Sequence, residues 1–358
     1  MRVNNYSSLT LANLHTGSIL NERAELVKAN YEAVNGRYYD MSATLGHKVK
    51  NLIEAQMRSS TLENYKSSNG LLEKRYESVQ FSLKALTDPK GPPKGTLQNF
   101  LENILGTNSG TDAKIAVDLA KTSIDSFMNF LNGNFEGYSI FGGEATKGDV
   151  LKPYKPDGKC PASADMQAAF DSFMKQKGIK SSENMTADQM QEFLDGPFAK
   201  FFEGENWQKY FSNVKETDAP ATQRINDRGK TLPKGVTINE PGFREAFKAM
   251  IMIAEFGTRK LNVSALRALE TRSTEVMAGG GITGVLRSSS QVGIYQNRLA
   301  EENGNIAARL KVLNDINIHL GSVDPAEAST RVNALENALN ISYQLTSRLS
   351  KLSLANYI

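Results

Sequence analysis

The sequence predicts a mainly α-helical protein whose long antiparallel helices, contributed by both chain termini, form a coiled-coil or rod core. Heptad spacing of apolar residues appears near the N-terminus and again after residue 292, and residues 324–358 form one amphipathic segment. The region between these segments is irregular, which predicts a small α+β hairpin region and an inserted outer domain.

The N-terminal heptad series alternates steps of four and three residues without a break. It comprises Leu20, Ala24, Val27, Tyr31, Val34, Tyr38, Met41 and Leu45, and Leu52 keeps the same register. This spacing places an apolar residue on one face at every turn, as in the seam of a coiled coil. Core-facing helices of an ordinary bundle would give a similar stripe, so one stripe does not decide between the two.

The C-terminal half carries two further apolar series. Val292, Leu299, Ile306, Leu313 and Leu320 fall every seven residues, with Tyr295 and Ile316 at intermediate positions and Glu302 and Arg309 as interruptions. The last segment carries Val332, Leu335, Leu339, Leu345, Leu349 and Leu352, and it ends on Leu354, Tyr357 and Ile358. An apolar chain end is explained if a partner helix covers it. Matching stripes at both termini predict that the termini pair and that the chain assembles with other subunits.

Glycine and proline positions predict where the elements begin and end. Residues 3–86 should be mostly helical, with breaks at Gly17, Gly36 and Gly46, and the Pro-Gly-rich segment 88–95 is a loop. Two amphipathic helices are expected near 97–105 and 115–131, followed by a strand that enters a tight turn over 138–143. A further helix should run from 243 to about 277, a flexible break should cover 278–284, and Asp324 and Pro325 should cap and start the last helix.

From about residue 150 to 242, prolines, glycines and aromatic residues become frequent and the heptads stop. The aromatics concentrate at Phe193, Phe198, Phe201, Phe202, Trp207, Tyr210 and Phe211. Few charged groups accompany these rings, so we interpret them as the core of a small inserted domain, although they could also line a ligand site.

The composition is that of a globular chain. Of 358 residues, 40% are hydrophobic and 23% charged, and 42 basic against 39 acidic residues leave a net charge of +3. The basic residues form no cluster with interleaved aromatics, so we expect no nucleic-acid partner. No apolar run approaches the roughly 18 residues of a membrane span, and no signal-peptide pattern opens the chain. We therefore expect neither membrane insertion nor a cleaved signal peptide.

The sequence predicts no catalytic, cofactor or metal site, and we interpret the chain as a non-enzyme. Cys160 is the only cysteine, which excludes an intramolecular disulfide and a cysteine-based zinc site. His15, His47 and His319 are scattered, and none has a second ligand at metal-binding spacing. The glycines at 279–281 are not followed by the Lys-Ser/Thr pair of a phosphate loop.

Two segments resemble the bacterial flagellin family. Residues 323–332 followed by 342–358 are similar to the C-terminal signature of the family, and residues 138–146 resemble the hairpin of its rod domain. The resemblance implies an inner coiled-coil domain (1–45 with 321–358), a helical rod domain (46–150 with 243–320, hairpin at 138–146) and an outer variable domain (151–242). The subunit-interface residues implied by it are Val27, Tyr31, Val34, Leu335, Leu339, Leu345, Leu349, Leu352, Leu354 and Ile358.

The resemblance also implies a structural role in the bacterial flagellum. A flagellin usually carries a Gly-Lys/Arg-Ile/Leu-Asn segment with an Asp pair after its first helix, whereas this chain has Asn35-Gly-Arg-Tyr-Tyr-Asp40. This departure favours the hook–filament junction type of the family, an adaptor that forms a ring and templates filament growth, over a filament-forming flagellin. The implied partners are further copies of the chain, the preceding hook-associated protein, flagellin, and an export chaperone at the C-terminal helix; the protein would be secreted.

Two alternatives from other functional classes remain open at this stage. The aromatic-rich insert 151–242 could be a cell-surface binding module, for example for a carbohydrate. An enzyme would have to use Cys160 as its functional group.

Overall fold

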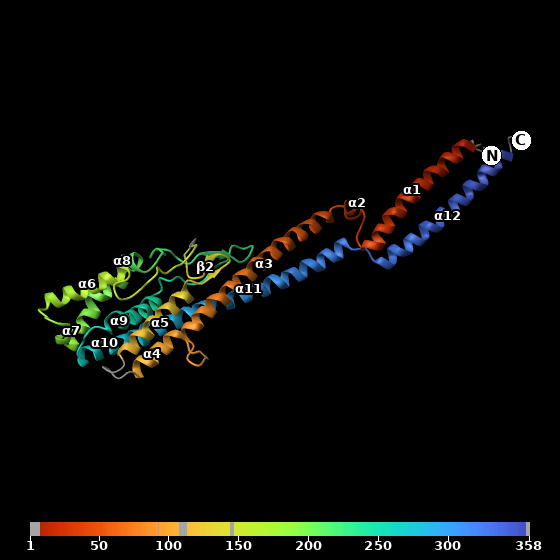
Figure 1. The fold of residues 1–358 in the computed structure, drawn as a ribbon. Coiled ribbons are helices and arrows are strands. Elements are labelled where there is room, and N and C mark those ends of the chain that lie inside the picture. The colour runs from red at the N-terminus through yellow and green to blue at the C-terminus, as the bar shows by residue number, and fades with distance from the viewer. Residues whose placement is uncertain (1–7, 92, 107–112, 144–146, 356–358) are drawn as a thin grey trace. The chain divides into compact units, whose positions relative to one another are not determined.

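The computed structural model describes residues 8–91, 93–106, 113–143 and 147–355, which form two compact units. Unit 1 contains residues 1–64 and 305–358, and unit 2 contains residues 65–304. The mainly α-helical class that the sequence predicted is confirmed, and the only strands among the described residues form two short hairpins (Figure 1). The α-helices are α1 (Ser8–Asn35), α2 (Met41–Leu45), α3 (Lys48–Thr87), α4 (Thr96–Gly106), α5 (Ala113–Leu131), α6 (Pro161–Gln176), α7 (Ala187–Phe193), α8 (Gly204–Tyr210), α9 (Pro241–Phe256), α10 (Val263–Val276), α11 (Thr283–Gly321) and α12 (Pro325–Ala355).

In unit 1, the terminal helices α1 and α12 lie side by side and antiparallel, because Glu22 meets Ser342 while Glu32 meets Arg331 (Figure 1). The predicted pairing of the two termini is therefore observed. Helix α1 ends at Asn35, where Gly36 adopts a left-handed φ of 64°, as the Asn-Gly step predicted.

The start of α12 also follows its sequence signals. The Asp324 side chain accepts a hydrogen bond from the Ala326 amide at 2.8 Å, and Pro325 is the first helical residue. The break expected at Gly17 is absent, and α1 continues through it. A single glycine inside a helix costs about 1 kcal/mol relative to alanine, which the surrounding helix tolerates.

Unit 2 is built around α9, whose residues from Ala249 to Phe256 are all buried. A helix that is apolar on every side must be enclosed by other elements, and α5, α10 and the insert supply that cover. Helices α3 and α11 contribute Tyr76, Leu83, Val292 and Leu299 to the same buried cluster. Val292 and Leu299, the members of the predicted heptad series that lie in unit 2, are therefore packing residues of this unit.

The aromatic side chains of the insert pack against α9. The ring of Phe247 lies 5.4 Å from that of Phe211 and 6.3 Å from that of Trp207, between ring centroids. Phe256 contacts Phe193 with a centroid distance of 5.2 Å. Residues 151–242 therefore share one buried cluster with α9: their aromatics are packing residues, as interpreted, but they do not form the core of a separate domain.

The first hairpin lies earlier in the chain than the sequence indicated. Strands β1 (Asn134–Phe135) and β2 (Tyr138–Ser139) pair antiparallel, so the segment predicted as the first strand is the second one. Glu136 and Gly137 form the two-residue turn with φ values of 52° and 79°, the left-handed pair that such hairpins require. Residues 144–146 of the predicted hairpin lie outside the described residues. A second hairpin, β3 (Thr222–Arg224) with β4 (Thr231–Pro233), was not predicted.

Two predicted elements after residue 241 were wrong. The single helix expected over 243–277 is two helices, α9 and α10, because the chain turns between Gly257 and Asn262. The flexible break expected at 278–284 is a π-helical turn, Met277–Ile282, that joins α10 to α11. A Cβ atom on Gly242 would lie 2.5 Å from the backbone of Gly284, so glycine serves close helix approach here rather than flexibility.

Candidate assembly surface of the terminal helix pair

The contact between α1 and α12 uses a regular series of positions, most of them apolar or small and a few of them polar. On α12 the positions of low exposure are Ala328, Val332, Leu335, Leu339, Ser342 and Thr346, at alternating steps of four and three residues. On α1 the matching series is Ile19, Glu22, Leu26, Ala29 and Ala33, with the same kind of spacing, and Glu32 beside Ala33 is buried as well. These two series form the inner seam of the pair, and they have the heptad spacing of a coiled coil.

The heptad series predicted on α1 is not this inner seam. Its members on α1 lie one or two residues after the inner-seam positions, and they are exposed. The exposed fractions are 59% for Leu20, 61% for Val27, 44% for Tyr31 and 82% for Val34. Helix α1 therefore carries two apolar stripes, of which one packs on α12 and the other remains uncovered on the protomer. We call the uncovered stripe, with Leu20, Val27, Tyr31 and Val34, the outer stripe.

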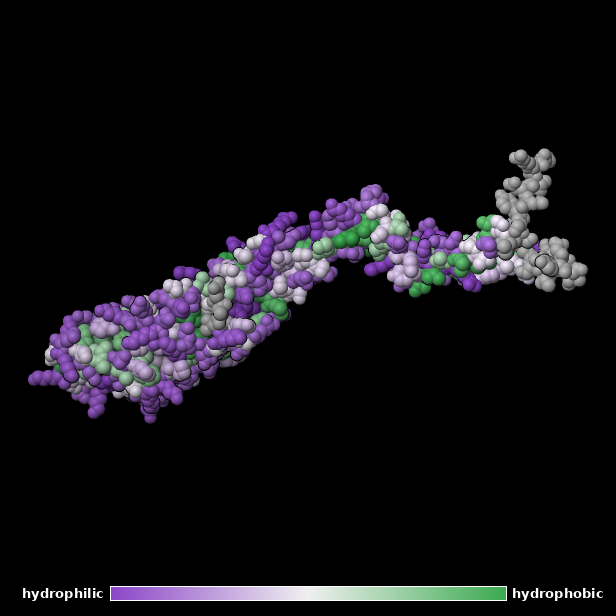
Figure 2. Space-filling model, turned by 90° about the horizontal axis from the view of Figure 1, so that it is seen from above, coloured by the Kyte–Doolittle hydropathy of each residue, from purple (hydrophilic) through white to green (hydrophobic). Residues whose placement is uncertain are grey.

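The predicted interface residues of α12 divide between the two environments. Leu339 is buried and Leu335 half-buried in the inner seam, whereas Leu345 is exposed. Ile341, one turn before Leu345, is also exposed and extends the apolar surface of this helix. The side chains of Leu349, Leu352 and Leu354, and residue Ile358, lie outside the described residues. Figure 2 shows apolar side chains interrupting the hydrophilic surface along the helix pair.

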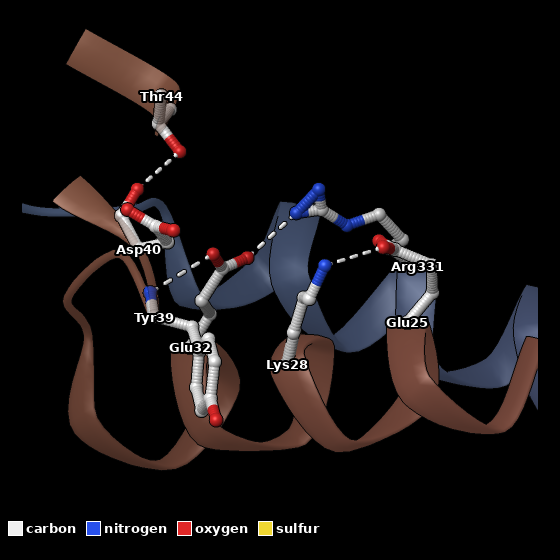
Figure 3. Close-up of polar contacts among 7 residues, drawn as sticks. All are labelled: Glu25, Lys28, Glu32, Tyr39, Asp40, Thr44 and Arg331. Carbon is white, nitrogen blue, oxygen red and sulfur yellow. Dashed lines mark hydrogen bonds and ion pairs between the residues drawn. The ribbon is translucent and has the colours of Figure 1, made fainter. Parts of the chain in front are cut away.

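A buried carboxylate joins the two helices and the following loop. Glu32 on α1 is 5% exposed and accepts hydrogen bonds from the Arg331 guanidinium at 2.6 Å and from the Tyr39 amide at 3.1 Å (Figure 3). The two donors approach its two carboxylate oxygens separately, so both oxygens have a partner. Sequence periodicity missed this pair, although opposite charges at matching positions of two predicted partner helices were a usable signal.

Acidic side chains around Arg331 favour its charged form in the pair with Glu32. The hydrogen bond from Arg331 to Glu32, assisted by the negative charges of Glu32, Glu25 and Glu327, raises the pKa of the Arg331 guanidinium despite partial burial. On the adjacent turn of α1, Lys28 contacts Glu25 at 2.7 Å and lowers the pKa of that carboxyl through a hydrogen bond. The Lys28–Glu25 pair is exposed and so contributes little to stability, whereas the desolvated Glu32 depends on its partners.

The turn after α1 is fixed by backbone and side-chain bonds. The Val323 amide donates to the Gly36 carbonyl at 3.0 Å, which ties the start of the turn to the chain before α12. Asp40 then caps α2 by accepting from the Ala43 amide at 2.9 Å. The rings of Tyr31 and Tyr39 meet edge to face at 5.5 Å between centroids. The segment 35–40 is therefore an ordered turn that presents two tyrosines beside the outer stripe.

Further toward the chain ends, two polar contacts hold the pair. Arg23 donates from Nε to the Tyr343 hydroxyl at 2.7 Å and lies over the Tyr343 ring. The Ser342 hydroxyl contacts Glu22 at 3.1 Å. The Glu22–Ser342 contact thus lies within the inner seam, and the Arg23–Tyr343 contact lies beside it.

The aromatic rings of the insert and Cys160 are the groups that a binding module or an enzyme would use. Five of the seven clustered aromatics of the insert are buried, and Phe201 and Tyr210 are half-buried against each other, so these rings do not line an open site. The structure places no group of three or more possible metal ligands together within its described part. Cys160 is half-buried at the start of α6. Across the described ranges, no helix is both long and apolar enough to cross a membrane.

Comparison with known proteins gives two matches. Residues 276–358 match the family described as the bacterial flagellin C-terminal helical region, so the predicted resemblance is confirmed for this segment. No curated protein matches the chain. A solved structure from Vibrio parahaemolyticus, assigned as a flagellar hook-associated protein, is similar with 11% sequence identity and a TM-score of 0.48, covering 76% of this chain and 96% of that one.

Proposed function

We propose that this chain is the adaptor between hook and filament. Its residues 276–358 match the flagellin C-terminal family, which supports a structural role in the bacterial flagellum. The proposal assigns it a mechanical and templating role with no chemical reaction. Copies of the chain form a ring through their terminal helix pairs, and the exposed end of the ring receives the first flagellin subunits.

The observation that carries the proposal is the outer stripe. Four large apolar side chains on one face of α1 are between 44% and 82% exposed, and Ile341 and Leu345 on α12 are 57% and 43% exposed. Complete burial of one such side chain is worth about 1.5–3 kcal/mol, so covering several of them together would offset the entropic cost of association. A surface of this kind, repeated on identical subunits, favours self-assembly into a symmetric structure.

The turn after α1 supports the junction role over the filament role. Here residues 35–40 form an ordered turn in place of the segment that flagellins usually carry, and Tyr39 and Asp40 belong to the polar contacts around Glu32 and α2 (Figure 3). A different turn at the base of the helix pair presents different side chains to neighbouring subunits. We propose that this difference limits the chain to one ring instead of a continuing filament.

The proposed partners follow from the same surfaces. Further copies of the chain would cover Val27, Tyr31 and Val34, and the preceding hook-associated protein and flagellin would contact the two ends of the ring. Ile341, Tyr343 and Leu345 are exposed on the protomer, so α12 offers an apolar site for an export chaperone before assembly. We propose secretion to the flagellum as the destination.

Negative-stain electron microscopy of the purified chain tests the proposal. The sample is incubated alone, with filament seeds and precipitant, and with isolated hooks that carry the preceding junction protein. We expect no filament from the chain alone and binding at the distal end of the hooks. Long filaments of the chain alone would instead identify a flagellin, which is the second candidate function.

A further inference from the structure

One buried polar layer interrupts the apolar contact between α3 and α11 in unit 2. Asn69 on α3 is fully buried, and its Nδ2 donates to Oδ1 of Asn303 on α11 at 2.8 Å and to the Ile225 carbonyl at 3.0 Å. Within the part of the chain that the structure describes, Oδ1 of Asn69 has no hydrogen-bond partner. An unsatisfied buried acceptor destabilises the folded state, so packing alone does not account for an asparagine here.

The β3–β4 hairpin closes this layer from a third side. Lys230 donates to the Glu302 carboxylate at 3.2 Å, next to Asn303 on α11. The loop that carries Lys230 is itself held by Asn226, whose Oδ1 accepts from the Lys230 amide at 2.9 Å. Gln223 of β3 donates to the Ser68 carbonyl at 2.9 Å, next to Asn69 on α3. Three elements therefore meet at the Asn69–Asn303 pair with matched polar groups.

The apolar residues of the two helices do not by themselves define how α3 and α11 align. On α11, Val292, Leu299, Ile306 and Leu313 repeat every seven residues; on α3, Leu62, Tyr76 and Leu83 lie on a grid of the same period, with Asn69 in the remaining place. Sliding one helix by seven residues would again set apolar against apolar positions. The same slide would place Asn303 opposite Leu62 or Tyr76 and break the hydrogen bond between the two asparagine side chains, which leaves the buried Asn69 amide with fewer partners.

We propose that Asn69 and Asn303 select the alignment of α3 with α11, with the β3–β4 hairpin as the element that recognises the correct alignment. The pair acts during folding, when repeated apolar positions would otherwise permit several alignments of nearly equal energy. A single polar position in a heptad series is known to specify register in coiled coils at some cost in stability.

Distance measurements between spin labels test this proposal. Labels at Leu71→Cys on α3 and Leu286→Cys on α11, both about half exposed, are introduced in a Cys160→Ser background. A slide of seven residues changes their separation along the helix axis by about 10 Å, since each helical residue rises 1.5 Å. Each variant is unfolded in denaturant and refolded quickly, and the distance distribution is recorded by pulsed electron paramagnetic resonance.

The labelled parent should refold to one distance, and so should the control Asn103→Leu, which adds a leucine at an exposed asparagine of α4. Asn69→Leu/Asn303→Leu should show a second population displaced by about 10 Å. Asn303→Leu alone keeps the Asn69–Ile225 bond and should show the same population at a smaller fraction. A single parental distance in the double variant overturns the proposal; if the double variant does not fold, a single parental distance in Asn303→Leu overturns it.

Discussion

Replacing Arg331 by methionine tests whether the buried carboxylate holds the terminal helix pair together. The side chain of Glu32 is 7% exposed and that of Arg331 is 53% exposed, so the substitution leaves a desolvated carboxylate with the Tyr39 amide as its only remaining donor among the described residues. Met and Arg have similar helix propensities, so the helix itself changes little.

The expected loss lies between two limits. Breaking a fully buried ion pair costs about 3–5 kcal/mol, and breaking an exposed one costs about 0–1 kcal/mol. Because Arg331 is half exposed and water can reach Glu32 once the guanidinium is gone, we expect a loss of about 2 kcal/mol. This corresponds to an increase of about 30-fold in the opening constant of the helix pair.

Native-state hydrogen exchange of the amides in α1 between residues 22 and 35 measures this opening directly. Arg348→Met is the control: Arg348 is an exposed arginine on α12, the helix that also carries Arg331, and its replacement should leave the exchange of the α1 amides unchanged. Glu32→Gln/Arg331→Met removes the unpaired charge and should recover most of the loss, which a double-mutant cycle quantifies. Exchange in Arg331→Met that is indistinguishable from Arg348→Met would refute the stabilising role of the pair.

Three further predictions concern unit 2. Burial raises the pKa of Glu302, but hydrogen bonds from Asn226 and Lys230 lower this pKa overall, so the stability that the carboxylate contributes is present above pH 4.5 and is lost as the pH falls below it. Glu302→Gln should therefore reduce the acid sensitivity of urea unfolding between about pH 5 and 3, and an unchanged pH dependence would contradict this. Gly284→Ala should lower the free energy of unfolding in denaturant by about 1–3 kcal/mol, because a Cβ atom there would lie 2.4 Å from the Gly242 backbone. In the control Gly279→Ala the added methyl group points into open space and should leave stability unchanged, so equal effects of the two variants would rule out the close approach as the reason. Phe247→Ala should lower the stability of the insert and the rod helices together by about 3–5 kcal/mol; two separate unfolding transitions would show that the insert does not depend on α9.

The periodicity of the sequence predicted that the termini pair, but not which stripe of α1 faces α12. Both stripes have coiled-coil spacing, and the one with larger residues, Val27, Tyr31 and Val34, is the exposed one. The inner seam contains Glu22 and Ala29 instead, because close helix packing favours small residues and a charge that finds a partner across the pair. Hydrophobicity alone could not distinguish contact within one chain from contact between chains.

Local signals were correct where a single residue type determines the backbone. Asn35-Gly36 ended α1, and Asp324-Pro325 started α12. The flexible break predicted from the glycines after Met277 was wrong, because a glycine can serve either a flexible break or the close approach of another helix. Only the tertiary contact between Gly242 and Gly284 separates these two uses.

The predicted interface residues fall into two environments in the structure. Val27, Tyr31, Val34 and Leu345 lie on the exposed surface, as residues awaiting a partner subunit should, and their role in assembly remains a prediction. Leu339 was expected at the interface between subunits but is buried within the helix pair of its own chain. The sequence prediction missed the Glu32–Arg331 pair because it rested on the spacing of apolar residues, and both members of this pair are charged.

Binding of Val34→Asp to hooks that carry the preceding junction protein tests most directly whether the outer stripe is the assembly surface. Val34 is 82% exposed, so the aspartate should leave the circular dichroism and unfolding of the protomer unchanged. Asn21→Asp adds the same charge to an exposed position of α1 away from the outer stripe and serves as the control. We expect that Val34→Asp no longer binds or caps the hooks, whereas Asn21→Asp binds as the parent does. Normal binding and filament growth with Val34→Asp would show that the outer stripe is not the assembly surface.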